Sequence, residues 1–259
     1  MVEVTSIMLR SSTCSILLAR MVVALATLGA AAPTAHAAMI TLGATGSGSD
    51  GSLAASATFT TSSGQLQIVL SNTLAANAIR SAGQALSDIS FTLSNAPGTV
   101  GTMTASGQLA NVASDGTTTN VSGAPVRWIG QGPPPPGGQG TFSITGNTIL
   151  MESLGGGQPS QMILPGGGTY TNVNNGFSNF NPYVIGPATF TLALSGVTAN
   201  TTITSAVFSF GTGPDTLLTA GAGAGGGSGS GQNVVPEPTS LMLLGSGLLW
   251  SATKLRRRS

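Results

Sequence analysis

The chain has 259 residues, of which only 6% are charged and 38 are glycine, so Ser, Thr, Asn and Gln must supply most of its polar surface. Between residues 38 and 233 two arginines stand against five carboxylates, and a net charge of −3 without a basic stripe excludes the usual electrostatic footprint of nucleic-acid binding. The single cysteine, Cys14, and the single histidine, His36, both precede residue 38, which excludes disulfides, Cys/His zinc sites and Ser-His or Cys-His catalysis in the remainder.

The first segment, residues 1–37, has the parts of a secretory signal peptide with a leader helix. Arginines precede an apolar stretch at 21–32, and these 12 residues are too few to span a bilayer, which needs about 20. We expect export through the Sec translocon, from a start at Met1 or Met8, and cleavage by signal peptidase after residue 37 or 38. The small residues that define this cleavage site are Ala35, Ala37 and Ala38.

Residues 38–219 show the period-two alternation of apolar and polar residues that is typical of half-buried strands. Alternation runs from Leu53 to Phe59, a turn of Ser and Gly follows at 62–64, and alternation resumes from Leu66 to Leu70, which predicts a hairpin. Further strands are predicted at 89–94, 101–109, 141–145, 148–152, 188–195 and 203–210.

Clusters of Asn, Asp, Gly and Ser separate these segments, which favours antiparallel pairing over βαβ units. We expect an all-β fold, an antiparallel β-sandwich of jelly-roll type, flanked by the signal helix and by one C-terminal transmembrane helix. A short helix or irregular turn is expected at 74–86, where apolar residues repeat every fourth position. The centre of the core is expected at Phe190, Leu192, Leu194, Ala206, Phe208 and Phe210.

Two stretches have a low-complexity composition. Residues 133–138 are prolines followed by glycines, which predicts a stiff surface loop. Residues 220–233 are rich in Gly, Ala and Ser, which is typical of a flexible linker that holds the following segment clear of the β domain.

The acidic residues of the central domain indicate turns more than catalysis. Asp50-Gly51 and Asp115-Gly116 are typical turn pairs. The carboxylates of Asp88, Glu152 and Asp215 remain, but their spacing along the chain places no two of them at the separation of about 5 to 10 Å that a glycosidase pair needs. We therefore expect no enzymatic activity, no cofactor and no metal site.

Aromatic residues leave one binding hypothesis open. Trp128, Tyr170 and Tyr183 either form a platform for sugar rings or fill the ends of the sandwich, and the second interpretation is favoured.

The last segment, residues 234–259, has three parts of its own. Pro236, Glu237 and Pro238 form an extended triplet, because proline breaks a helix and restricts the residue before it. An apolar stretch at 239–253 predicts a short transmembrane helix. The basic residues that stop and orient this helix, with its end on the cytoplasmic side, are Lys254, Arg256, Arg257 and Arg258.

In this order, the triplet, the short apolar helix and the arginine-rich end resemble a PEP-CTERM sorting signal. The resemblance is specific because the three elements coincide over 234–259. It implies that an exosortase recognises Pro236, Glu237 and Pro238 while the helix serves as a temporary anchor. It also implies a transient stay in the inner membrane, followed by transfer to the cell envelope or extracellular matrix of a Gram-negative bacterium.

The sequence thus predicts a non-enzymatic envelope or matrix protein with a structural or adhesive role linked to exopolysaccharide. The expected partners are the Sec translocon, signal peptidase, exosortase and exopolysaccharide, and nucleic acid is not among them. Two alternatives stay open: a carbohydrate-binding module, and a tail-anchored membrane protein that is never processed.

Overall fold

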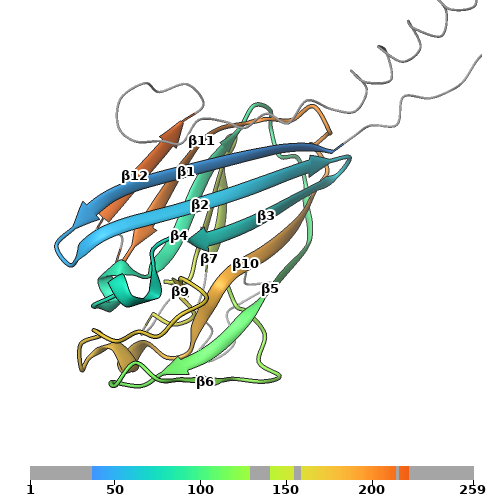
Figure 1. Cartoon of the computed structure of the whole chain (residues 1–259). Coiled ribbons are helices and arrows are strands. Elements are labelled where there is room, and N and C mark those ends of the chain that lie inside the picture. The colour runs from blue at the N-terminus through green and yellow to red at the C-terminus, as the bar shows by residue number, and fades with distance from the viewer. Residues whose placement is uncertain (1–36, 129–140, 155–158, 214–215, 222–259) are drawn as a thin grey trace, which may run out of the picture. The chain divides into compact units, whose positions relative to one another are not determined.

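The computed structural model of the chain describes residues 37–128, 141–154, 159–213 and 216–221 (Figure 1). These residues form twelve β-strands and three short 3-10 helices, and no α-helix occurs among them. The strands are β1 Ala38–Gly48, β2 Gly51–Ser62, β3 Gln65–Asn72, β4 Leu86–Leu93, β5 Val100–Val112, β6 Thr118–Asn120, β7 Thr141–Thr145, β8 Thr148–Glu152, β9 Ile163–Leu164, β10 Tyr183–Leu194, β11 Ile203–Phe210 and β12 Thr216–Gly221. The 3-10 helices are η1 Ala76–Ala78, η2 Ala82–Gln84 and η3 Phe177–Phe180.

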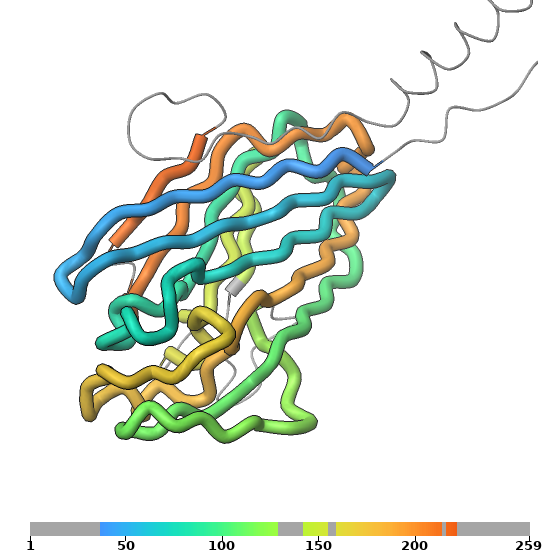
Figure 2. Tube along the Cα trace, viewed as in Figure 1, coloured from blue at the N-terminus to red at the C-terminus, as the bar shows by residue number. Residues whose placement is uncertain are grey.

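All twelve strands belong to one sheet, whose main path is β1-β2-β3-β10-β9-β4-β11-β12. The sheet branches where β5 pairs with β10 and where β8 pairs with β4, and β6 and β7 extend these two branches. Paired strands are antiparallel except β9 and β10, which are parallel. The trace in Figure 2 shows β1, β2, β3, β10 and β5 following one another across one side of the domain.

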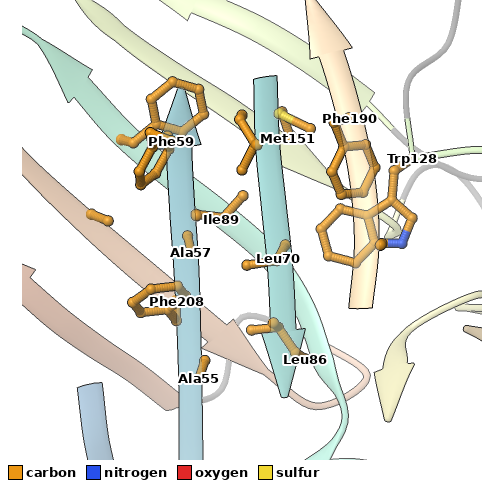
Figure 3. Close-up of a cluster of buried hydrophobic side chains, with 14 of the residues drawn as sticks. Ala55, Ala57, Phe59, Leu70, Leu86, Ile89, Trp128, Met151, Phe190 and Phe208 are labelled. Atoms are coloured by element: carbon orange, nitrogen blue, oxygen red, sulfur yellow. The ribbon is translucent and has the colours of Figure 1, made fainter. Parts of the chain in front are cut away.

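Strand alternation directs one face of each half of the sheet into a common core. Phe59 of β2 and Phe91 of β4 have ring centroids 5.1 Å apart, although their strands are not neighbours in the sheet. The sheet therefore folds over, and its two halves face each other. Figure 3 shows this cluster, in which Phe208 of β11 and Ile89 of β4 are also fully buried. Each such side chain contributes about 1.5–3 kcal/mol through burial.

The two end strands of the main path lie close together. At Gly46 of β1, a Cβ atom would be 2.5 Å from Cδ2 of Leu218 on β12. Glycine at this position therefore leaves room for the leucine side chain. The segment has little strand propensity, yet all eleven residues of β1 pair with β2.

A second, smaller apolar cluster lies beneath the irregular segments. Tyr183 and Phe177 stack at 4.7 Å between centroids, and Tyr170 lies 6.4 Å from Phe177. Ile79 and Met162, both fully buried, complete the centre of this cluster. Through this cluster, η1, η2 and η3 pack against the C-terminal end of β5, at Val112, and the N-terminal end of β10, at Tyr183.

Most of the predicted elements are confirmed. The hairpin is β2 and β3, with Gly64 in the turn at φ +73°. The predicted strands at 141–145, 148–152 and 203–210 agree residue by residue with β7, β8 and β11. The segment at 101–109 is part of the longer strand β5, and the segments at 89–94 and 188–195 overlap the longer strands β4 and β10 but extend one residue past their ends. All six residues expected at the core centre are 0% exposed: Phe190, Leu192, Leu194, Ala206, Phe208 and Phe210.

Other expectations are refined or lie outside the described residues. The helix or turn at 74–86 is two 3-10 helices, and β1, β6, β9 and β12 were not predicted. The last strand runs to Gly221, two residues beyond the predicted domain boundary at 219. The all-β, mainly antiparallel fold is confirmed, whereas the jelly-roll connectivity stays a prediction.

The predicted signal helix at 1–37 and transmembrane helix at 239–253 lie outside the described residues, apart from Ala37. Among the residues that are described, no helix is long and apolar enough to cross a membrane.

Candidate functional site

The structure brings together two carboxylates that the sequence left apart. Asp88 on β4 and Glu152 on β8 are directly opposite each other in the antiparallel ladder. Opposite residues in such a ladder have Cβ atoms about 4.5–5.5 Å apart. On the other side of Asp88, β11 places Ser209 opposite it, and the Ser209 hydroxyl donates a hydrogen bond to the carboxylate.

The environment of Asp88 disfavours its charge. The residue is only 4% exposed, and burial raises its pKa from 3.8 to about 6. This value already includes two smaller effects on the pKa: the hydrogen bond from Ser209 lowers it, and the negative charge of Glu152 raises it. Burial dominates, so Asp88 holds its proton over a pH range in which an exposed aspartate is ionised.

The surroundings of Asp88 are those of a structural polar cluster. The Ser87 hydroxyl donates to the carbonyl of Ser209, and the Ser153 hydroxyl donates to the carbonyl of Ser87, and all three serines are at most 4% exposed. A raised carboxyl pKa next to a second carboxylate is the arrangement of a glycosidase acid. Here, however, the side chain of Asp88 is enclosed and already hydrogen-bonded to the protein.

The two Asp-Gly pairs take the turn conformations that the sequence predicts. Asp115 accepts hydrogen bonds from the backbone N–H of Thr117 at 2.9 Å and from its hydroxyl at 2.7 Å, and Gly116 has φ +80°. These hydrogen bonds lower the pKa of Asp115. Gly51 likewise adopts a positive φ of +122° in the turn between β1 and β2.

The aromatic residues considered for sugar contact are buried in this structure. Trp128 is 0% exposed, packs on Phe190 with centroids 5.4 Å apart, and donates its Nε1–H to the carbonyl of Gln161 (Figure 3). Tyr170 and Tyr183 are 1% and 0% exposed, and their hydroxyls donate to the carbonyls of Pro165 and Phe177. None of the three rings presents a face to a ligand. They belong to the buried apolar clusters, and the interpretation that they fill the ends of a sandwich stays a prediction.

Gln161 is a buried residue that the sequence did not indicate. It has a left-handed φ of +59°, which is uncommon for a residue other than glycine. Its Oε1 accepts from the N–H of Arg127 at 2.6 Å, and its Nε2 donates to the carbonyl of Pro125. Together with the Trp128 hydrogen bond, these contacts fasten the segment 125–128 to the core.

A polar surface is formed by the outward face of β1, β2, β3, β10 and β5. None of these five strands contains a charged residue. Register places polar side chains side by side across the sheet, and the hydroxyl oxygens of Thr41 and Thr58 are 2.9 Å apart. We call this surface the hydroxyl face and define it by Thr41, Thr58, Thr60, Gln67, Thr104, Ser106, Thr189 and Thr191.

The regular spacing of the hydroxyl face follows from strand geometry. Thr60 is opposite Gln67, Gln67 is opposite Thr191, and Thr191 is opposite Thr104. Neighbouring strands are about 4.8 Å apart, so hydroxyl and amide groups recur across the face at that interval. Part of the signal for this face was present in the sequence, as alternating Ser or Thr at Ser56, Thr58 and Thr60 of the predicted hairpin and at Thr102, Thr104 and Ser106 of the predicted strand at 101–109.

Residues 234–258 match the PEP-CTERM protein-sorting motif. The chain carries a PEP-CTERM sorting motif. The match confirms the resemblance, and the motif indicates a protein that an exosortase sorts to the surface of a Gram-negative cell. No curated protein and no solved structure matches the chain.

The residues of the PEP-CTERM motif lie outside the described part of the chain. They include the recognition triplet and the basic end, so the roles assigned to them stay predictions: Pro236, Glu237, Pro238, Lys254, Arg256, Arg257 and Arg258.

The predicted signal-peptide cleavage site adjoins the first strand. Ala37 is exposed and Ala38 begins β1, while Ala35 lies outside the described residues. Cleavage after Ala37 would leave the whole of β1 in the mature PEP-CTERM protein. Cleavage by signal peptidase itself stays a prediction.

Proposed function

We propose that this PEP-CTERM protein is a non-enzymatic component of the cell envelope or extracellular matrix, with a structural or adhesive role linked to exopolysaccharide. The observation that carries the proposal is the sorting motif at 234–258, which directs the chain to the cell surface. The β domain supplies the part that acts there.

The hydroxyl face supports the matrix role. Its Thr, Ser and Gln side chains offer hydrogen-bond donors and acceptors without net charge. Neutral polysaccharides present hydroxyl groups of the same kind, so hydrogen bonds through Thr58, Thr60 and Thr191 suit a hydrated, uncharged glycan. The expected partner is therefore a neutral region of the exopolysaccharide.

The absence of catalysis is part of the proposal. Residues 38–233 contain no histidine or cysteine, and Asp88, the member of the carboxylate pair with the raised pKa, is 4% exposed. A carbohydrate-binding module that uses aromatic stacking is not proposed as a second function, since Trp128, Tyr170 and Tyr183 are buried.

Intact-mass measurement tests the sorting step. The protein is recovered from the envelope and medium of cells with and without the exosortase. We expect loss of the segment 239–259 only in cells that have the enzyme. Retention of this segment in both strains contradicts processing and leaves the tail-anchored alternative.

Binding to the exopolysaccharide tests the adhesive role separately. The exported protein should be retained on neutral polysaccharide, and Thr58→Glu and Thr191→Glu should each weaken retention by placing a charge on the hydroxyl face. Ser90→Glu on β4, where the outward face belongs to the other half of the sheet, is the control. Equal retention of all variants contradicts the role assigned to this face.

A further inference from the structure

The strand β5 lies at an edge of the sheet along most of its length. One side of β5 pairs with β10, and on the other side β6 pairs only with Ala110, Asn111 and Val112. In the part of the chain that the structure describes, no strand lies beside the outer edge of Gly101–Gly107. Thr102, Thr104 and Ser106 are exposed. Such an edge offers unpaired N–H and C=O groups to another strand.

This edge has little of the protection that natural edge strands usually carry. Exposed edges are commonly blunted by lysine, proline, an inward-pointing charge or a bulge. The segment Gly101–Gly107 contains no charged residue and no proline. Register shifts against β10 occur at its two ends, and Met103–Ser106 pair regularly between them. The middle of the edge is thus straight and uncharged.

The order of residues in this segment is nearly the same from either end. Around Thr104, glycine occupies both 101 and 107, a hydroxyl residue occupies both 102 and 106, and an apolar residue occupies both 103 and 105. In an antiparallel pair, residues on opposite strands meet at positions whose numbers have a constant sum. A two-fold axis through Thr104 therefore places each residue type opposite its own type.

We propose that β5 pairs antiparallel with β5 of a second copy of this chain, around Thr104. Two-fold pairing of this kind is isologous: the same surface of each copy forms the interface, and the contact closes as a dimer. Thr104 meets its own equivalent, Thr102 meets Ser106, and Gly101 meets Gly107. No pair in this register brings like charges together.

The same pairing extends features already present in one copy. Met103 and Ala105 are half-buried and pack against the main core, and a second strand beside them covers their exposed edges. Thr104 and Ser106 belong to the hydroxyl face, so the faces of both copies become one continuous surface across the joined sheet. A dimer of this form presents twice the polar surface to a matrix ligand.

A charge-swap experiment tests the proposal on the full chain. Two copies with different affinity tags are produced together, extracted, purified through one tag and probed for the other. We expect co-purification of wild-type copies. It should be lost when both copies carry Thr104→Lys or both carry Thr104→Glu, because like charges then oppose each other.

Co-expression of two oppositely charged variants distinguishes loss of the interface from loss of folding. A Thr104→Lys copy together with a Thr104→Glu copy should co-purify again, a result that damaged folding of either variant does not produce. The control is Thr58→Lys on β2, which lies inside the sheet and should leave co-purification unchanged. Wild-type yield from two Thr104→Lys copies, or no recovery in the mixed pair, overturns the proposal.

Cysteine cross-linking tests the register. With Cys14→Ser as the background, Thr104→Cys should give a disulfide dimer on mild oxidation of cells, and Thr58→Cys should stay monomeric. A mixture of Thr102→Cys and Ser106→Cys copies should cross-link between the two variants. Equal cross-linking at positions 58 and 104 overturns pairing through β5. The absence of cross-linking at 104 also overturns it, and this is the result expected if a strand of another protein occupies the edge.

Discussion

Asp88 of β4 stands directly opposite Glu152 of β8, so an acidic pair is built into the polar outer side of the sheet. Ser209 of β11 provides the hydrogen bond that partly compensates the burial of Asp88. Because burial raises the pKa of Asp88 to about 6, the pair makes the stability of the fold depend on pH.

Asp88→Asn should stabilise the protein at neutral pH. The folded state binds the Asp88 proton more tightly than the unfolded chain does, since the pKa is about 6 in the fold and 3.8 without it. The contribution of Asp88 to wild-type stability is therefore fully present below pH 3.8 and is lost as the pH rises through about 6. Asparagine removes this loss, and we expect a gain on the order of 3 kcal/mol at pH 7 and none at pH 3.5. Urea unfolding at the two pH values measures it.

Asp115→Asn is the matched control for this prediction. Hydrogen bonds from Thr117 lower the pKa of Asp115, so its stabilising effect is present above pH 3.8 and is lost as the pH falls. The substitution should not raise stability at pH 7. A similar gain from both variants would indicate a general effect of net charge instead of the burial of Asp88.

Gly116→Ala should destabilise the domain strongly. The residue has φ +80°, and an added Cβ would be 1.8 Å from the carbonyl oxygen of Tyr170, which is backbone and cannot move aside cheaply. We expect a loss of about 3 kcal/mol or more. Gly64→Ala tests the conformational part alone, since Gly64 has φ +73° with nothing within 4 Å of the added atom. That variant should lose about 1–2 kcal/mol. Equal losses would show that the contact with Tyr170 is unimportant.

Trp128→Ala should reduce the free energy of unfolding by about 3–5 kcal/mol, because it leaves a cavity beside Phe190 and removes the hydrogen bond to Gln161. Trp128→Phe should lose less, since most of the ring volume is kept. Chemical unfolding of both variants distinguishes this structural role from ligand contact. If Trp128→Ala unfolds like the wild type, the indole is not a core residue.

Glu237→Ala should leave the protein in the inner membrane. The glutamate lies between two prolines in the triplet that the sorting motif implies as the recognition element. Cell fractionation followed by immunoblotting measures the distribution between inner membrane and cell surface. Asn233→Ala, just before the motif, is the control and should be sorted normally. Normal sorting of Glu237→Ala would remove the glutamate from recognition.

The strands that were predicted from the sequence are those with strong alternation. In β2 and β3, apolar residues occupy every second position and Gly64 allows the turn between them, so local pattern and final structure agree. β1 and β12 lack such a pattern because of their glycine, alanine and threonine content. Each pairs with the strand next to it in the chain, β1 with β2 and β12 with β11, and the approach of Gly46 to Leu218 is a contact between these two strands.

The candidate sites likewise divide into those that the sequence predicts and those that depend on tertiary structure. The sorting motif was found from sequence because an exosortase reads a short, contiguous segment. The carboxylate pair was not found, because 64 residues separate Asp88 from Glu152 and only the pairing of β4 with β8 brings them together. The burial of Trp128, Tyr170 and Tyr183 was likewise one of two open interpretations, since a sequence does not show whether an isolated aromatic side chain will be enclosed or exposed.

The amino-acid sequence by itself determined the route of this protein, its all-β class and the polar, uncharged character of its strands, because each of these depends on local composition and order. Only the tertiary structure decided which residues meet. Strand pairing placed Asp88 opposite Glu152, enclosed the aromatic rings, aligned Thr60, Gln67, Thr191 and Thr104 into one face and left β5 at an edge. The physical reason is that sheet hydrogen bonds join segments regardless of their separation in the chain, so long-range register creates neighbours that no local pattern encodes.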